Sequence, residues 1–129
     1  MYSDFYFVNK EKGVVVCVLR NCEGDAFLDF SQRFYNEHER YMTPVNQKYF
    51  INSTYRGIAK CDFSEDEFNE TFGKDLAFQR ARNKYLRAKA KMIRRICNDM
   101  TQKIENNINP YLENLDKTID KSDKLLEVK

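Results

Sequence analysis

The sequence predicts an α+β fold: an N-terminal antiparallel sheet with one inserted helix, followed by a long basic helix and a shorter C-terminal helix. Short apolar and aromatic runs typical of strands occupy much of residues 1–62, whereas residues 63–129 show helical periodicity and contain only one Gly and one Pro. The chain has 129 residues, enough for one domain but not comfortably for two, so we expect a single domain over 1–129.

About four strands are expected in the sheet region. An aromatic run and a β-branched run are separated by a turn at 10–13, and a second turn with Gly24 is expected at 21–25. The expected strands are 5–8, 14–19, 49–51 and 55–61, the last two as a hairpin.

The inserted helix is expected over residues 26–41. Aromatic and other large residues recur there at spacings of three and four, which is the helical period. Asp25 is the expected N-cap, and Pro44 lies just beyond the end. The recurring residues are Phe27, Phe30, Phe34, His38 and Tyr41.

In the helical region, Ser64 and Glu67 have the spacing of a capping box, so a helix is expected to begin near residue 65. Gly73 either bends this helix or ends a short separate one at 65–72, before a long helix from 74 to about 107.

Pro110 then suits the first turn of a last helix, expected from residue 111 to about 125. Three apolar residues lie on one side of it: Leu112, Leu115 and Ile119.

The long helix has two opposed faces on a helical wheel. Its apolar side is expected to comprise Phe78, Ala81, Tyr85, Ala88, Met92, Ile96 and Met100. Its basic stripe comprises Arg80, Lys84, Arg87, Lys91, Arg94 and Arg95, with no acidic residue between the first and the last.

Like charges three and four residues apart repel, so we expect an anionic group to offset the basic stripe. It is either a phosphate-bearing ligand or nucleic acid, or the acidic segment within 65–75 of this chain or of a second copy. Arg82 and Lys89 fall instead in the apolar sector, where their charged ends either reach water or face a polar cavity.

Composition and sequence features indicate what kind of protein this is and in which compartment we expect it. A content of 42% hydrophobic and 33% charged residues indicates a folded protein, and the net charge of +2 favours no partner by itself. We expect a cytoplasmic protein, since the sequence has neither a membrane-spanning apolar stretch nor a secretory signal. Scattered cysteines without a Cys-x-x-Cys pair indicate reduced structural thiols and no zinc site: Cys17, Cys22, Cys61 and Cys97.

One stretch of the sequence resembles a known family. The pattern begins with a strand that ends in a polar turn, at 57–62, and continues with an acidic-aromatic segment at 65–69. A Gly then leads into a basic helix at 73–77, which is followed by the Arg-Ala step Arg80-Ala81. Over roughly residues 55–90 this pattern is similar to that of the first-described family of phage anti-Thoeris proteins.

The resemblance implies a non-catalytic sponge without a cofactor. Proteins of that family have a sheet followed by long helices, and they oligomerise. They sequester cyclic ADP-ribose isomers made by bacterial TIR-domain immune enzymes, and some also take up cyclic oligonucleotides, so that the host effector is never activated.

The candidate ligand residues lie mostly in or beside this stretch, and none is transferred from the family by position. Arginine pairs can hold a pyrophosphate bidentately, an aromatic ring can stack on adenine, and an amide can bond a hydroxyl or base edge. For the two Phe residues ordinary core packing is the alternative, and for Arg56 an exposed strand position. The candidates are Arg56, Phe63, Phe72, Arg80, Asn83, Arg87 and Lys91.

Other partners fit parts of the same sequence. A nucleic acid can follow the basic helix over 80–95, and an acidic protein can dock against it. A homo-oligomer, at least a dimer, is expected because a thin sheet leaves Leu86, Ile93 and Cys97 to be covered by a second copy. Catalysis is the least favoured class, since His38 is the only histidine and no nucleophile stands beside it.

Overall fold

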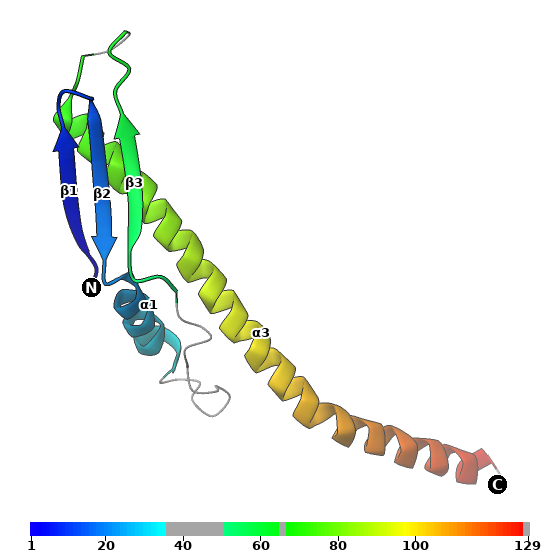
Figure 1. The fold of residues 1–129 in the computed structure, drawn as a ribbon. Helices are drawn as coiled ribbons and strands as arrows, with labels where there is room; N and C mark the ends of the chain where they lie inside the picture. Colours follow the sequence, from blue (N-terminus) through cyan, green and yellow to red (C-terminus); the bar gives the residue numbers. More distant parts are fainter. Residues whose placement is uncertain (36–50, 65–66, 128–129) are drawn as a thin grey trace.

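The computed structural model describes residues 1–35, 51–64 and 67–127, and confirms the α+β class with a helix inserted into the sheet (Figure 1). The elements in chain order are β1 (Ser3–Asn9), β2 (Val14–Arg20), α1 (Cys22–Phe30), the π-helical turn η1 (Ser31–Tyr35), β3 (Tyr55–Lys60) and α3 (Glu70–Glu127).

The three strands form an antiparallel sheet in the order β1-β2-β3. Alternate side chains point to opposite faces, so Val15, Cys17 and Leu19 face α3 and are fully buried. A fourth strand at 49–51 was expected; only Ile51 of that range lies within the described residues, and it is not in a strand.

Two expectations around α1 are wrong. The segment 21–25 is not a turn, because α1 begins at Cys22 directly after Asn21, whose backbone takes the left-handed conformation with φ of 62°. Asp25 is therefore in the first turn of the helix rather than its N-cap. The helix ends at Phe30 and continues as η1, and the predicted remainder, 36–41, lies outside the described residues.

The start of α3 also differs from the expected capping box. Ser64 donates both its backbone N–H and its hydroxyl to Asp62, and so stabilises a local turn. The cap is Asn69, whose Oδ1 accepts the backbone N–H of Phe72 at 3.0 Å. A short helix over 65–72 is wrong, since residues 67–69 are not helical and Glu70–Glu127 is one element.

The separate C-terminal helix is wrong as well, because α3 runs through both Gly73 and Pro110 as one helix of 58 residues. Gly73 lies where the helix meets β2: an added Cβ would be 2.8 Å from Cγ2 of Val15. Pro110 lies in an exposed stretch, where water can bond the carbonyl that its missing N–H leaves without a donor. In Figure 1 the helix changes direction in its orange part, which contains Pro110.

The helix packs on the sheet through small residues. An added Cβ at Gly57 would lie 2.0 Å from the carbonyl oxygen of Ala77 and 2.4 Å from the backbone nitrogen of Ala81, so the backbones of β3 and α3 are nearly in contact. The predicted apolar side is confirmed at Ala81, Tyr85, Met92 and Ile96, which are buried. In the N-terminal part of the helix Ala77 is buried, whereas Phe78 is only partly buried.

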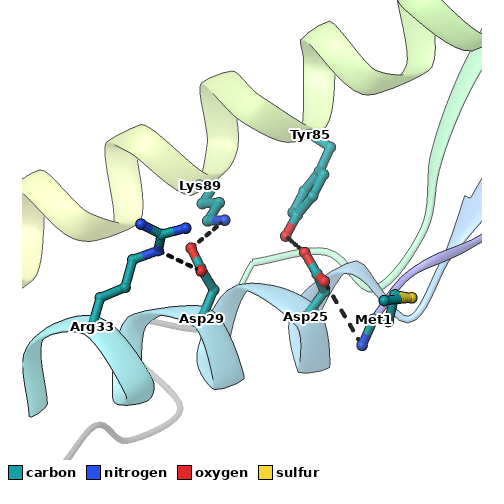
Figure 2. Close-up of polar contacts among 6 residues, drawn as sticks. All are labelled: Met1, Asp25, Asp29, Arg33, Tyr85 and Lys89. Atoms are coloured by element: carbon teal, nitrogen blue, oxygen red, sulfur yellow. Dashed lines mark hydrogen bonds and ion pairs between the residues drawn. The ribbon is translucent and has the colours of Figure 1, made fainter. Parts of the chain in front are cut away.

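A polar contact holds α1 against α3 (Figure 2). The hydroxyl of buried Tyr85 donates a hydrogen bond to Asp25, which also lies 3.7 Å from the N-terminal ammonium. Nζ of Lys89 lies 2.6 Å from Asp29, and Nε of Arg33 donates to the same carboxylate at 2.7 Å. Lys89 thus meets a carboxylate of α1.

The close approach at Gly57 predicts that Gly57→Ala lowers the free energy of unfolding by at least about 2 kcal/mol, because its methyl group meets helix backbone that cannot rotate away. Urea unfolding followed by circular dichroism measures this change. Gly24→Ala is the control: its methyl meets the end of the flexible Asn21 side chain, and its effect should stay within about 1 kcal/mol. Equal stabilities of the two variants would contradict the packing described.

The contact at Asp29 predicts a pH-dependent stability. Hydrogen bonds from Arg33 and then Lys89 lower the pKa of this carboxyl. Its stabilising effect is therefore complete above the ordinary pKa of about 4 and is lost as the pH falls through the lowered folded-state pKa. The free energy of unfolding of the wild type should exceed that of Asp29→Asn by about 1 kcal/mol near neutral pH, and this difference should vanish in acid.

Urea unfolding of both proteins across this range provides the measurement. Glu11→Gln, which removes an exposed carboxylate outside this contact, should differ little from the wild type at any pH. A wild-type advantage over Asp29→Asn that persists unchanged in acid would refute the assignment.

Candidate functional site

A groove of about 420 Å³ runs between the β3 edge and the first half of α3. Three of the predicted ligand residues, Arg80, Asn83 and Arg87, lie together in it. Its full lining is Gly57, Ile58, Arg80, Asn83, Lys84 and Arg87.

Hydrogen bonds orient the side chains of the groove. Nη1 of Arg80 donates to the carbonyl oxygen of Ile58 at 2.6 Å, so this guanidinium bridges helix and strand. Nε of Arg87 donates to Oδ1 of Asn83 at 3.3 Å, which leaves the amide NH2 of Asn83 as a donor. The side chains therefore present N–H groups to the groove, and the apolar wall is Ile58.

The positive charge of the groove is not neutralised within the described residues. No carboxylate there forms an ion pair with Arg80, Lys84 or Arg87. Of the acidic segment expected as an internal partner, the described members Glu67, Glu70 and Asp75 pair with none of the stripe cations. The described residues therefore contain no carboxylate that offsets the repulsion among Arg80, Lys84 and Arg87.

The other predicted ligand residues lie elsewhere. Lys91 is exposed on the same face of α3, one turn beyond Arg87. Arg56 is exposed on the face of the sheet opposite α3. Phe63 and Phe72, the expected stacking residues, are 53% and 64% exposed and do not line the groove.

A larger cavity of about 490 Å³ lies at the other end of the sheet, where Phe72 and Leu76 face the hairpin. Its charged lining residues are of both signs: Lys60, Asp62 and Glu67. The Asp62 carboxylate is already bonded to Ser64, which lowers its pKa. This cavity therefore lacks the concentrated positive charge that selects an anion.

Three groove residues were missed as ligand candidates. Lys84 had a signal, since it stands four residues after Arg80 and three before Arg87. No pattern in the sequence indicated Gly57 and Ile58, because their place in the groove depends on which strand packs against the basic helix.

The described residues were also compared with the requirements of metal sites, membrane spans and reactive thiols. Within it, no group of three or more His, Cys, Asp or Glu residues could hold a metal ion, and no helix is long and apolar enough to cross a membrane. Burial raises the pKa of the Cys22 thiol to about 11, so this core cysteine stays protonated. His38 lies outside the described residues.

Comparison with known proteins adds no assignment: no family model, no curated protein and no solved structure matches this chain. The similarity to the anti-Thoeris family stays a prediction from the residues that suggested it.

The unpaired charges predict that Lys84→Gln raises the stability of the ligand-free protein by about 0.5 kcal/mol, because it removes repulsion with Arg80 and Arg87. Thermal and urea unfolding at low salt provide the measurement, and the gain should shrink in high salt. Arg82→Gln is the matched control, since Arg82 is exposed on the same helix with no cation three or four residues away. Destabilisation by Lys84→Gln would mean that Lys84 has a favourable partner in the free protein.

Proposed function

We propose that this protein binds a small phosphate-bearing nucleotide in the groove between β3 and α3 and holds it without converting it. The observation that carries the proposal is the convergence of Arg80, Lys84 and Arg87 with the donor amide of Asn83, with no carboxylate among the six lining residues. Paired guanidinium groups are the preferred ligands for phosphate oxygens.

The dimensions of the groove agree with such a ligand. Its volume of about 420 Å³ lies within the range of about 300–1,000 Å³ typical of small-molecule sites. Ile58 offers an apolar surface for a base or ribose beside the cationic groups. A pyrophosphate between the guanidinium groups and a base against the strand edge would use both features.

The resemblance noted in the sequence suggests the nucleotide. We propose a cyclic ADP-ribose of the glycocyclic type, with cyclic oligonucleotides as a second group, sequestered in the host cytoplasm so that an immune effector is not activated. No enzymatic step is proposed, because the groove lining contains no carboxylate, imidazole, thiol or hydroxyl.

A nucleic-acid partner is the second candidate, favoured by the continuation of the basic stripe beyond the groove. Lys91, Arg94 and Arg95 are exposed and extend the positive face to a length of about 22 Å from Arg80. A surface of this kind can follow successive phosphates, with affinity that falls steeply as salt increases.

The two candidates are separated by isothermal titration with a glycocyclic ADP-ribose and with a short RNA duplex, each at low and high salt. We expect tight nucleotide binding that Arg87→Gln weakens by at least about tenfold, since hydrogen bonds to charged groups are worth roughly 1.5–3 kcal/mol. Arg82→Gln, exposed on the same helix outside the groove, is the control and should bind like the wild type.

Release of the ligand by denaturation, followed by chromatography, tests whether it is held intact. Recovery of unchanged nucleotide supports sequestration, and a converted product would make the protein an enzyme. Duplex binding alone, lost in high salt, would favour the nucleic-acid candidate. No binding of either would contradict both and favour docking on an acidic protein.

A further inference from the structure

The face of the sheet opposite α3 is apolar and largely uncovered. Strand alternation and register place eleven side chains on it: Ser3, Phe5, Phe7, Asn9, Val14, Val16, Val18, Arg20, Arg56, Ile58 and Lys60. Phe5, Phe7 and Ile58 are 42%, 58% and 45% exposed. An open sheet face with this much exposed apolar surface is typical of a binding surface.

The charges on this face have one sign. It carries three cations and no carboxylate, and two of the cations, Arg56 and Lys60, lie along the edge strand β3. The third, Arg20, has its guanidinium over the Phe5 ring at 4.3 Å. The face therefore combines an apolar area over β1 and β2 with a positive border along β3.

The C-terminal part of α3 carries the complementary pattern. Every residue from 105 to 127 is exposed, and the helix projects away from the sheet there (Figure 1). At about 100° per residue Tyr111 and Leu125 lie to one side, whereas five other apolar side chains form one stripe. They are Ile108, Leu112, Leu115, Ile119 and Leu126, which are 46%, 48%, 40%, 54% and 65% exposed.

The charges of this segment are sorted around the same wheel. All six carboxylates fall in one sector directly beside the apolar stripe: Glu105, Glu113, Asp116, Asp120, Asp123 and Glu127. The three lysines, Lys117, Lys121 and Lys124, fall on the side away from the stripe. The segment thus has an apolar surface with an acidic border.

We propose that residues 105–127 of α3 from one copy of this chain dock on the open sheet face of another copy. The apolar stripe covers the side chains of β1 and β2, and the acidic border meets Arg56 and Lys60 on β3. Opposite charges at the border of an apolar contact fix the direction and register of such a complex.

The dimensions of the two surfaces agree. A strand of seven residues is about 23 Å long, and the stripe from Ile108 to Leu126 is about 27 Å long. Arg56 and Lys60 are about 13 Å apart along β3, and Asp116 and Asp123 are about 10.5 Å apart along the helix.

The tail cannot make this contact with the sheet face of its own chain, so the complementary surfaces meet between two copies. Its own α3 packs on the other face of the sheet, where an added Cβ at Gly57 would meet Ala77 at 2.0 Å, and runs on as one continuous helix. The interface joins two different surfaces, so it closes by mutual exchange or as a ring. It shares Ile58 with the lining of the groove, but it uses none of the groove cations and does not depend on the proposed ligand.

The test uses the full chain without ligand, with mass measured by light scattering and sedimentation at micromolar concentration. The sheet variant is Arg56→Glu with Lys60→Glu, and the tail variant is Asp116→Lys with Asp123→Lys. The matched control, Lys117→Glu with Lys121→Glu, reverses two charges on the other side of the same helix. We expect the wild type and the control to associate, and each of the first two variants to associate at least about tenfold more weakly.

An equimolar mixture of the sheet and tail variants decides the geometry. The intact tail of the first fits the intact sheet of the second, so a mixed complex should form although each variant alone is monomeric. A monomeric wild type would overturn the proposal. The proposal would also be overturned if the tail variant failed to associate while the sheet variant associated like the wild type, because the tails would then pair with each other.

Discussion

The near-contact between the backbones of β3 and α3 is the constraint on which the rest of the structure depends. Because Gly57 has no side chain, the helix lies against the strand at Ala77 and Ala81, and the Cβ of Arg80 comes within 3.0 Å of where a Gly57 Cβ would be. From there its guanidinium reaches the carbonyl oxygen of Ile58. The groove exists because a basic helix face is held this close to an edge strand.

The cations on the two sides of α3 have different surroundings. On the side toward α1, Lys89 meets Asp29, and Tyr85 is enclosed by Tyr2 and Tyr55 at ring distances of 5.5 and 5.8 Å while bonding Asp25. Burial and the hydrogen bond to Asp25 raise the pKa of Tyr85, so its hydroxyl remains a donor. On the opposite side Arg80, Lys84 and Arg87 receive no described carboxylate. This contrast is the physical basis of the proposal that the basic stripe binds an anion.

Charge is also segregated along the length of α3, which the net charge of +2 conceals. The first half is basic and the exposed last part is acidic beside an apolar stripe, so one helix carries two surfaces of opposite charge.

The sequence by itself determined the fold class, the strands at 5–8 and 14–19, and the face of α3 that carries the cations, because hydrophobic period and charge spacing are local properties. It misplaced the caps: Asp25 and Ser64 have suitable side chains, but Asn21 and Asn69 occupy the actual boundaries. The passage of the helix through Pro110 depends on that stretch being exposed to water. Only the tertiary structure decided that Gly57 and Ile58 complete the groove and that Phe63 and Phe72 do not, since strand pairing and helix docking join residues distant in sequence.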